Sequence, residues 1–237
     1  MRAVVYAGTR NVYDDMVTAA KSLLLTTAVD RVFFLIEDDE FPEPLPDIIQ
    51  TIDVSNQTWF SPDGPNFKCP WTYMVLLRAA YTKIFPDLDR IVNLDIDTIV
   101  RKDISALWEI GMDGWYFAGV PETKKTIGGV TYINFGVCVM NLSLLRDGTD
   151  DKAINIIDTQ RMFATEQDAF NALCQGRIRR LPSEYNACAY TAPCGDPRVI
   201  HFAGIGEMFP WSRKRWQDSP ILEPYRRMTW EDVLCRS

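Results

Sequence analysis

Two aspartates, Asp95 and Asp97, directly follow a short apolar run and are the residues of this sequence best suited to do chemistry. The run, residues 90–94, reads Arg-Ile-Val-Asn-Leu, which predicts a buried strand. On an extended segment, side chains two residues apart point the same way. Two such carboxylates repel each other unless a cation lies between them, and hard oxygen ligands suit Mg²⁺ or Mn²⁺. A cation held there can bridge a diphosphate and stabilise charge on a departing phosphate.

The Asp pair also has a second catalytic interpretation, because Asp-x-Asp-x-Thr after an apolar strand opens the haloacid-dehalogenase phosphatases. In those enzymes the first Asp is a nucleophile toward phosphate and the second is an acid or base. Their motif normally ends the first strand, whereas Asp95 comes after at least two apolar runs, and no Lys followed by paired acids is evident. A phosphatase or nucleotidyltransferase therefore remains an alternative, and a non-catalytic binding module is another.

The segments around the Asp pair alternate between strands and helices. Short apolar runs predict strands at residues 4–7, 31–36, 90–94, 116–120, 132–142 and 199–202. Amphipathic patterns predict helices at residues 12–27, 72–85, 151–162 and 166–173. Strands that alternate with helices and lack period-2 patterning predict an α/β fold with a mainly parallel central sheet, covered on both faces.

The bulk composition suits one soluble α/β domain. The chain has 237 residues and a net charge of −7, from 25 Lys plus Arg and 32 Asp plus Glu, which argues against a general nucleic-acid binder. None of the six cysteines forms a C-x-x-C pair, and no apolar run has the length of a signal-peptide core or a membrane span. We therefore expect free thiols and a cytoplasmic protein.

The chain divides at about residue 211. Residues 1–211 are predicted to form the catalytic domain, and residues 212–237 a C-terminal extension in which Lys and Arg mix with Trp and Tyr. Such a mixture suits peripheral contact with an anionic membrane surface. It equally suits a segment that covers the sheet, which is the interpretation we favour.

Several further blocks occur in a fixed order around the Asp pair. They are Tyr6-Ala7 with Asn11, Arg78, residues 89–108, residues 132–142, residues 166–171, and His201-Phe202-Ala203-Gly204 with Pro210-Trp211. In these blocks, from residue 4 to about residue 211, the sequence resembles the retaining glycosyltransferases of family 8, which include glycogenin and the bacterial lipooligosaccharide galactosyltransferases. The resemblance implies the GT-A fold, a Rossmann-like sheet flanked by helices.

The resemblance also implies roles for individual residues. Asp95, Asp97 and His201 would bind Mn²⁺, or Mg²⁺ in its place. The nucleotide-sugar would be bound by Ala7, Thr9, Asn11, Arg78, Asp95, Ile96, Asn134, Gly136 and Gly204. Glu166, Gln167 and Asp168 would be the catalytic group, with Gln167 on the reactive face of the anomeric carbon in a positioning role.

Some of these residues have a purely structural interpretation as well. His201, the single histidine of the chain, could be a packed core residue, Arg78 could lie on a solvated helix face, and Asn134 could be a hydrogen-bonded strand residue. Thr165 and Asp168 have the spacing of a helix capping box, so Asp168 could serve the helix rather than the reaction.

The sequence departs from the family pattern at two positions. Thr9 stands where the family often has an Asp near uracil, and the phosphate-binding Lys before Pro-Trp is missing. Arg213, Lys214 or Arg215 could supply the missing charge. The implied reaction is transfer of glucose or galactose from a UDP-sugar to a hydroxyl of a glycan, a lipid-linked sugar or a protein, with retention of configuration. The route to retention stays open between a Glu166 or Asp168 nucleophile and attack on the leaving-group face.

Overall fold

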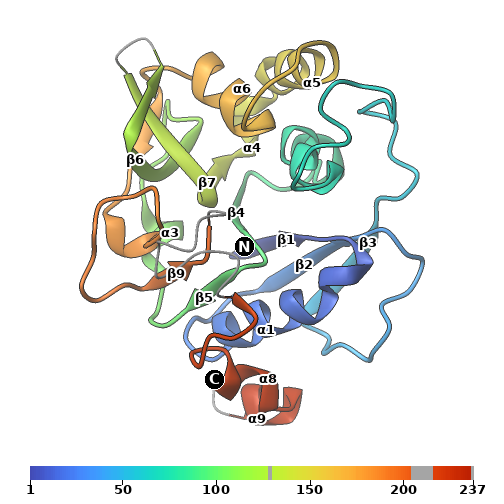
Figure 1. Ribbon diagram of the computed structural model, residues 1–237, viewed down its shortest axis with the longest axis vertical. Coiled ribbons are helices and arrows are strands. Elements are labelled where there is room, and N and C mark those ends of the chain that lie inside the picture. Colours follow the sequence, from blue (N-terminus) through green and yellow to red (C-terminus); the bar gives the residue numbers. More distant parts are fainter. Residues whose placement is uncertain (128–129, 204–215, 236–237) are drawn as a thin grey trace.

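The computed structural model describes residues 1–127, 130–203 and 216–235, and it confirms the α/β architecture (Figure 1). Its main sheet has seven strands in the order β3-β2-β1-β4-β7-β6-β8. Only β7 runs against its neighbours; the pairs β3–β2, β2–β1, β1–β4 and β6–β8 are parallel. The strands are β1 Ala3–Ala7, β2 Arg31–Ile36, β3 Ile49–Asp53, β4 Arg90–Leu94, β6 Phe117–Ile127, β7 Val130–Asn141 and β8 Ile178–Arg180.

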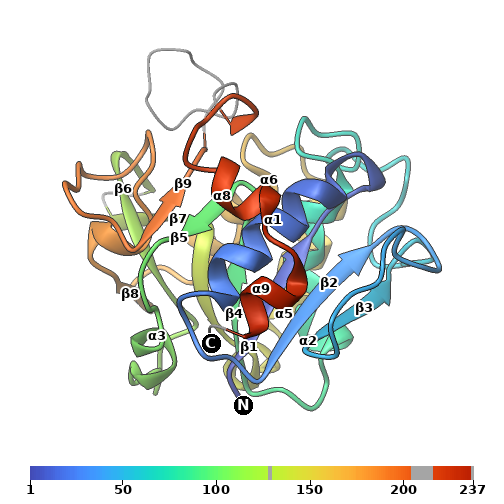
Figure 2. The same ribbon diagram turned by 90° about the horizontal axis from the view of Figure 1, so that it is seen from below.

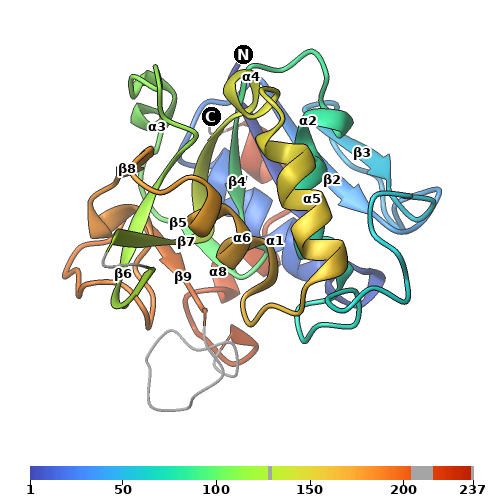
Figure 3. The same ribbon diagram turned by 90° about the horizontal axis from the view of Figure 1, so that it is seen from above.

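Both faces of the sheet are covered, as the unbroken apolar runs of its strands require. Helix α1, Tyr13–Leu24, lies on one face (Figure 2). The other face is covered by η2 Tyr73–Ala80, α2 Tyr81–Ile84, α4 Leu142–Leu145, α5 Thr149–Thr159 and α6 Thr165–Leu173 (Figure 3). Alternate residues of β1 therefore belong to separate cores: Val4 and Tyr6 pack with α1, and Val5 packs with η2.

Three expectations about these elements need correction. The helix expected at residues 72–85 is mostly a 3₁₀ helix, η2, followed by only one α-helical turn in α2. Strand β6 continues well beyond residue 120, where the sequence stops being apolar. Strands β3 and β8 are not in the expected set, because β3 at the sheet edge is half polar and β8 is only three residues long. The remaining short elements are η1 Arg10–Val12, α3 Ala106–Glu109 and η3 Ser183–Tyr185.

A separate pair of short strands, β5 and β9, brings His201 next to the Asp pair. Strand β5, Thr98–Val100, runs antiparallel to β9, Val199–His201, and Thr98 lies opposite His201. The pairing continues past the strands, because the backbone N–H of Phe202 donates to the carbonyl of Asp97 at 2.9 Å. His201 is thus fixed beside Asp97 by backbone hydrogen bonds.

The described part of the C-terminal extension packs on α1 and on the β5–β9 pair. Helices α8, Glu223–Arg227, and α9, Trp230–Leu234, lie against α1 (Figure 2). Trp216 is fully buried beside Phe202, and its Nε1 donates to Asp15 Oδ1 at 2.6 Å. This arrangement supports the covering role, although the segment covers α1 rather than the sheet directly.

Other expectations for the extension stay predictions. The boundary at residue 211 and the basic residues Arg213, Lys214 and Arg215 lie outside the described residues. Among the helices of the described ranges, none is both long and apolar enough for a membrane span. Peripheral membrane contact and a cytoplasmic location stay predictions.

Candidate metal and nucleotide-sugar site

Asp95, Asp97 and His201 converge at the carboxyl end of β4. Each offers one ligand atom, and these three atoms lie within 4.8 Å of one another. The imidazole Nε2 of His201 is 3.4 Å from Asp95 Oδ2 and 3.3 Å from Asp97 Oδ1. His201 is buried and both carboxylates are half-buried. His201 is therefore more than a packed core residue, because its Nε2 faces two carboxylates.

The electrostatics of this trio favour a bound cation. Burial would lower the pKa of His201, but Asp97 and Asp95 outweigh it and raise that pKa well above its ordinary value. Burial would raise the pKa of Asp95, but Arg78 and His201 together lower it to about 2. Both shifts show that positive charge beside the two carboxylates stabilises this site. Two carboxylate oxygens and an imidazole nitrogen are a donor set that Mn²⁺ and Mg²⁺ accept.

Gly136 in β7 leaves the space that the imidazole occupies. A Cβ at this position would lie 1.9 Å from Cε1 and 2.4 Å from Nδ1 of His201, far inside van der Waals contact. The same residue holds the other side of the site, because the backbone N–H of Asp95 donates to the Gly136 carbonyl at 2.8 Å. The residues present thus fit a divalent metal site, with glycine required at this point.

A series of buried hydrogen-bonded side chains connects Gln167 with the trio Asp95, Asp97 and His201, which we call the metal corner. Asn186 Oδ1 lies 3.0 Å from His201 Nδ1, and Asn186 Nδ2 donates to Asn134 Oδ1 at 2.9 Å. Asn134 Nδ2 donates to Glu122 Oε1 at 3.1 Å, and Gln167 Nε2 donates to the same oxygen at 3.2 Å. Asn134 is therefore hydrogen-bonded, as its structural interpretation expected, but its partners belong to the site.

Two members of this series, Asn186 and Glu122, were not among the predicted site residues. Glu122 lies in the polar part of β6, where no local pattern marks it. Asn186 follows η3 and reaches His201 because β9 pairs beside it: the His201 N–H donates to the Ala187 carbonyl at 3.0 Å. The only sequence signal for either was the presence of a polar side chain near apolar residues.

Arg78 lies between the Asp pair and the catalytic candidates. Its guanidinium forms an ion pair with Asp95 and donates from Nη1 to Glu166 Oε1 at 2.5 Å. Arg78 is only 8% exposed, so the solvated-face interpretation is wrong. Burial raises the pKa of Glu166, and Arg78 opposes that rise without cancelling it. A single cation thus compensates two carboxylates on different elements.

We expect Arg78→Met to destabilise the fold by about 3–5 kcal/mol, because it leaves Glu166 buried without its counter-charge. The pKa of Glu166 would then rise further, so the stability of the variant should fall as pH increases through that raised pKa. Urea unfolding between pH 5 and pH 8 measures both effects. The double variant Arg78→Met, Glu166→Gln should recover part of the loss; an equal or larger loss would contradict the charge argument.

The expected Thr165–Asp168 capping box does not form. Thr165 has a φ of 43°, and its hydroxyl donates to Glu166 instead of accepting from the helix backbone. Asp168 accepts from the backbone N–H of Ala164 at 2.8 Å and from the Tyr132 hydroxyl at 2.6 Å. The box fails because Ala164, not Thr165, is the residue at the N-cap.

Gln167 is held from three sides. Its Oε1 accepts from the backbone N–H of Phe135 at 2.9 Å, and its Nε2 donates to Glu122 and to the Tyr132 hydroxyl at 2.9 Å. An amide fixed in this way offers a defined polar surface but little nucleophilicity. The geometry agrees with a positioning role for Gln167.

The residues predicted to bind the nucleoside, Ala7, Thr9, Asn11 and Ile96, lie at the carboxyl ends of two neighbouring parallel strands, β1 and β4. Ala7 ends β1, which pairs with β4, and Ile96 lies between Asp95 and Asp97. Thr9 donates to Asn11 Oδ1 at 2.5 Å, so the two polar groups lie side by side. Open α/β sheets bind ligands at this end, beyond the carboxyl ends of their strands. Gly204, the remaining predicted residue, lies outside the described residues.

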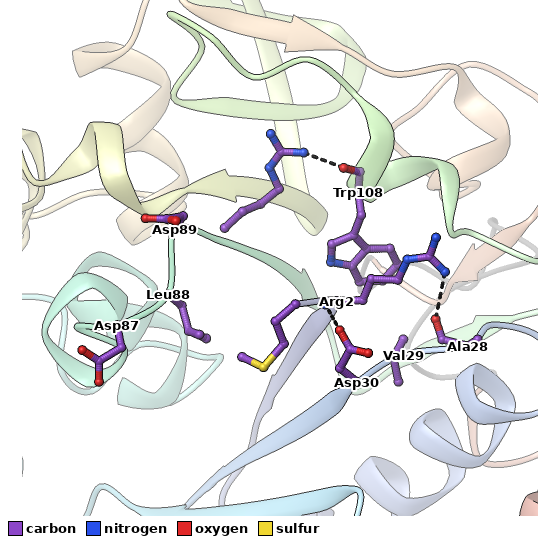
Figure 4. A pocket seen from close by; sticks show the side chains of 10 residues that line it. Arg2, Ala28, Val29, Asp30, Asp87, Leu88, Asp89 and Trp108 are labelled. Atoms are coloured by element: carbon purple, nitrogen blue, oxygen red, sulfur yellow. Dashed lines mark hydrogen bonds between the residues drawn. The ribbon is translucent and has the colours of Figure 1, made fainter.

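A cavity of about 660 Å³ lies at the opposite end of the strands, near the starts of β1 and β4 (Figure 4). Arg2, Asp30 and Trp108 are among its lining residues, and no predicted site residue lines it. Several of its polar groups have protein partners: Arg2 donates to Ala28 and Asp30, and Arg90 donates to the Trp108 carbonyl. The cavity is therefore not the candidate site.

Comparison with known sequences places this geometry in a family. The sequence model of the family described as Glycosyl transferase family 8 matches residues 3–215. The chain belongs to glycosyl transferase family 8. This membership sets the Asp95–Asp97 pair in a glycosyltransferase family rather than in the phosphatase family that the same motif could have indicated.

The relatives of this family 8 chain include named transferases. Lipopolysaccharide 1,2-glucosyltransferase of Escherichia coli K12 is 26% identical over 206 residues, which cover 77% of this chain and 61% of that protein. General stress protein A of Bacillus subtilis is 27% identical over 189 residues, covering 64% and 63% respectively. The chain thus spans less than two thirds of the length of these curated relatives.

Solved structures show the fold of the family 8 chain. Galactosyltransferase LgtC in complex with donor and acceptor sugar analogues aligns with a TM-score of 0.71 at 19% identity, over 99% of this chain and all of that one. The glycosyltransferase GlyE of Streptococcus pneumoniae TIGR4 also gives 0.71 at 19% identity, over 99% of this chain and 62% of that one. At this identity the likeness concerns the fold alone.

Proposed function

We propose that the protein is a metal-dependent retaining glycosyltransferase that moves a hexose, glucose or galactose, from a UDP-sugar to an acceptor hydroxyl. The observation that carries the proposal is the convergence of Asp95, Asp97 and His201 at the carboxyl end of β4. A relative named as a lipopolysaccharide glucosyltransferase, and a structural neighbour solved with donor and acceptor sugar analogues, support the substrate class. Glycan, lipid-linked sugar and protein all remain candidate acceptors.

The metal corner would hold Mn²⁺ or Mg²⁺ through Asp95, Asp97 and His201. When bound, the cation supplies positive charge that stabilises the departing diphosphate. Ala7, Thr9 and Asn11 lie on the neighbouring strand end, where they would bind the nucleoside, with the backbone at Ile96 closing its other side. Any charge that replaces the missing Lys would come from Arg213, Lys214 or Arg215, outside the described residues.

The sugar would lie beside Gln167, Asn134 and Glu122, whose polar groups are already oriented by one another. Glu122 adds a carboxylate that can accept from sugar hydroxyls, and it belongs in the proposed donor pocket. Gly136, which the sequence assigned to the nucleotide-sugar, would act through His201 instead, because the space above it is occupied by the imidazole. Preorganised groups of this kind hold a substrate without reordering cost at the moment of reaction.

The surroundings of the acids favour attack on the leaving-group face. Glu166 is 2% exposed, and its two carboxylate oxygens are bonded to Arg78 and Thr165. Both oxygens of Asp168 are bonded as well, to Ala164 and Tyr132. A nucleophile needs a free oxygen facing the substrate, so we assign Glu166 an electrostatic role and Asp168 a supporting one. A trapped glycosyl-enzyme adduct on either residue would contradict this assignment.

The test is release of free nucleotide from a panel of nucleotide-sugars, with Mn²⁺ and with chelator, in the presence of mixed acceptor extracts. Metal-dependent turnover of one UDP-hexose would support the proposal and identify the sugar. Metal-dependent nucleotide binding without turnover of any donor would support the non-catalytic binding module instead. Hydrolysis of a simple phosphoester without nucleotide would support the phosphatase.

A further inference from the structure

The hydrogen bonds that lead to His201 begin at the backbone N–H of Gly136, a group that can only donate. The backbone N–H of Gly136 donates to the side chain of Asn134 at 3.0 Å. A backbone N–H can only donate, so the Asn134 atom that faces it must be Oδ1. This fixes the orientation of the Asn134 amide, which leaves its Nδ2 pointing at the carboxylate of Glu122.

Asn134 in turn fixes the orientation of Asn186 and, through it, that of the His201 imidazole. We call this series of hydrogen bonds, from Gly136 through Asn134 and Asn186 to His201, the relay. Because Asn134 presents Oδ1, the Asn186 atom 2.9 Å away must be the donor Nδ2. Asn186 therefore presents Oδ1 to His201 at 3.0 Å, and the facing ring nitrogen, Nδ1, must carry a proton. The other nitrogen, Nε2, faces Asp95 and Asp97. The only neutral imidazole that fits has its lone pair on Nε2.

We propose that Asn186 is a positioning residue that, with Asn134, fixes the tautomer and the ring plane of His201 for metal binding. The inference rests on the proposed metal site and goes beyond it, because neither amide is among the proposed ligands. Reversal of the relay would set donor against donor at Gly136, or lone pair against lone pair at His201. In this buried location, where Asn186 is 0%, His201 3% and Asn134 6% exposed, water cannot repair such a conflict.

The relay has a second consequence, because it continues to the proposed sugar pocket. Asn134 holds Asn186 through Oδ1 and Glu122 through Nδ2, and Glu122 also accepts from Gln167. The imidazole and Gln167 are therefore linked by an unbroken series of hydrogen bonds. The metal corner and the sugar pocket are set by one continuous network.

The experiment uses nuclear magnetic resonance of protein labelled with ¹⁵N in histidine. His201 is the single histidine of the chain, so tag-free protein has only one imidazole. Two-bond correlations report which ring nitrogen carries the proton. In the Mg²⁺-loaded wild type we expect the proton on Nδ1 and a Mg²⁺-dependent shift at Nε2.

Two substitutions of Asn186 separate positioning from a merely structural role. Asn186→Leu removes the acceptor, so the tautomers should mix and the Mn²⁺ affinity, measured by water-proton relaxation, should fall ~10–100-fold. Asn186→Asp keeps an acceptor for Nδ1–H but sets a carboxylate oxygen against Asn134 Oδ1, so the tautomer should return and the affinity should recover only in part. Asn66→Leu removes a buried amide that bonds to Ile157 and Gln160, and it controls for general destabilisation.

The inference is overturned if the wild-type proton lies on Nε2, or if Asn186→Leu retains both the Nδ1–H tautomer and the wild-type affinity. The first reading needs no variant and holds even if Asn186→Leu fails to fold. Failure of the metal site looks different: the imidazole would not respond to Mg²⁺. The neutral metal-free ring at high pH would then still show whether the relay places the proton on Nδ1.

Discussion

Asp97→Asn is expected to lower kcat/KM for the sugar donor on the order of 10²–10³-fold, the cost of losing one preorganised group that stabilises developing charge. The substitution keeps the shape of the side chain but removes one of the two negative charges beside His201. A neutral amide binds a divalent cation more weakly than a carboxylate does. The transfer that remains should respond little to added Mn²⁺.

The measurement compares nucleotide release across a Mn²⁺ titration for the wild type, Asp97→Asn and Asp113→Asn. Asp113 is exposed and lies in a turn, so its variant carries the same change of charge away from the site. Because the backbone of Asp97 bonds to Phe202 whichever side chain is present, we expect near-native melting for both variants. Full, metal-dependent turnover by Asp97→Asn would contradict the proposed metal site.

The central part of this site could be predicted from sequence because its signals are local. Asp95 and Asp97 come directly after an apolar strand, and the carboxyl end of such a strand is where ligands bind in this fold class. The place of His201 came from the resemblance, and the pairing of β5 with β9 gives its physical reason. Fold class and metal corner were within reach because each depends on a strand and on the residues at its carboxyl end.

The rest of the site could not be predicted because it depends on contacts between distant segments. Asn186 acts on His201 only because the Ala187 carbonyl meets β9, and Glu122 meets Gln167 only through the long hairpin of β6 and β7. Arg78 was assigned to the site by the resemblance, but its place in an expected helix gave no sign of its partners, Asp95 and Glu166. Periodicity describes a segment and carries no information about its partner.

The failed capping box shows the same limit at one residue. Thr165 and Asp168 have the required spacing, but the helix begins with Ala164 at the N-cap and Thr165 turned to φ 43°. That conformation costs free energy for a β-branched residue. Here the Thr165 hydroxyl binds Glu166, whose carboxylate also receives Arg78. A tertiary contact at the site thus replaces the local cap that the sequence suggested.

Gly136→Ala is expected to disable the site while leaving every proposed metal ligand in the sequence. The new Cβ would lie 1.9 Å from Cε1 of His201, so the ring must move by more than 1 Å. The imidazole is buried and hydrogen-bonded to Asn186, so a shift of the ring must also displace its neighbours. A displacement of about 1 Å costs on the order of 10²-fold in rate, and overpacking costs about 1–3 kcal/mol of stability.

Gly111→Ala is the matched control, because a Cβ there would meet only Arg179, at an ordinary 3.5 Å. Mn²⁺ affinity, melting temperature and nucleotide release should be near native in Gly111→Ala and all reduced in Gly136→Ala. Native Mn²⁺ affinity in Gly136→Ala would show that the ring position beside Gly136 is not the metal-binding one. Asp97→Asn removes charge at fixed geometry, whereas Gly136→Ala moves a ligand at fixed charge. If both abolish metal-dependent transfer, the site needs its carboxylates and its imidazole in this arrangement, not merely a cluster of acids at a strand end.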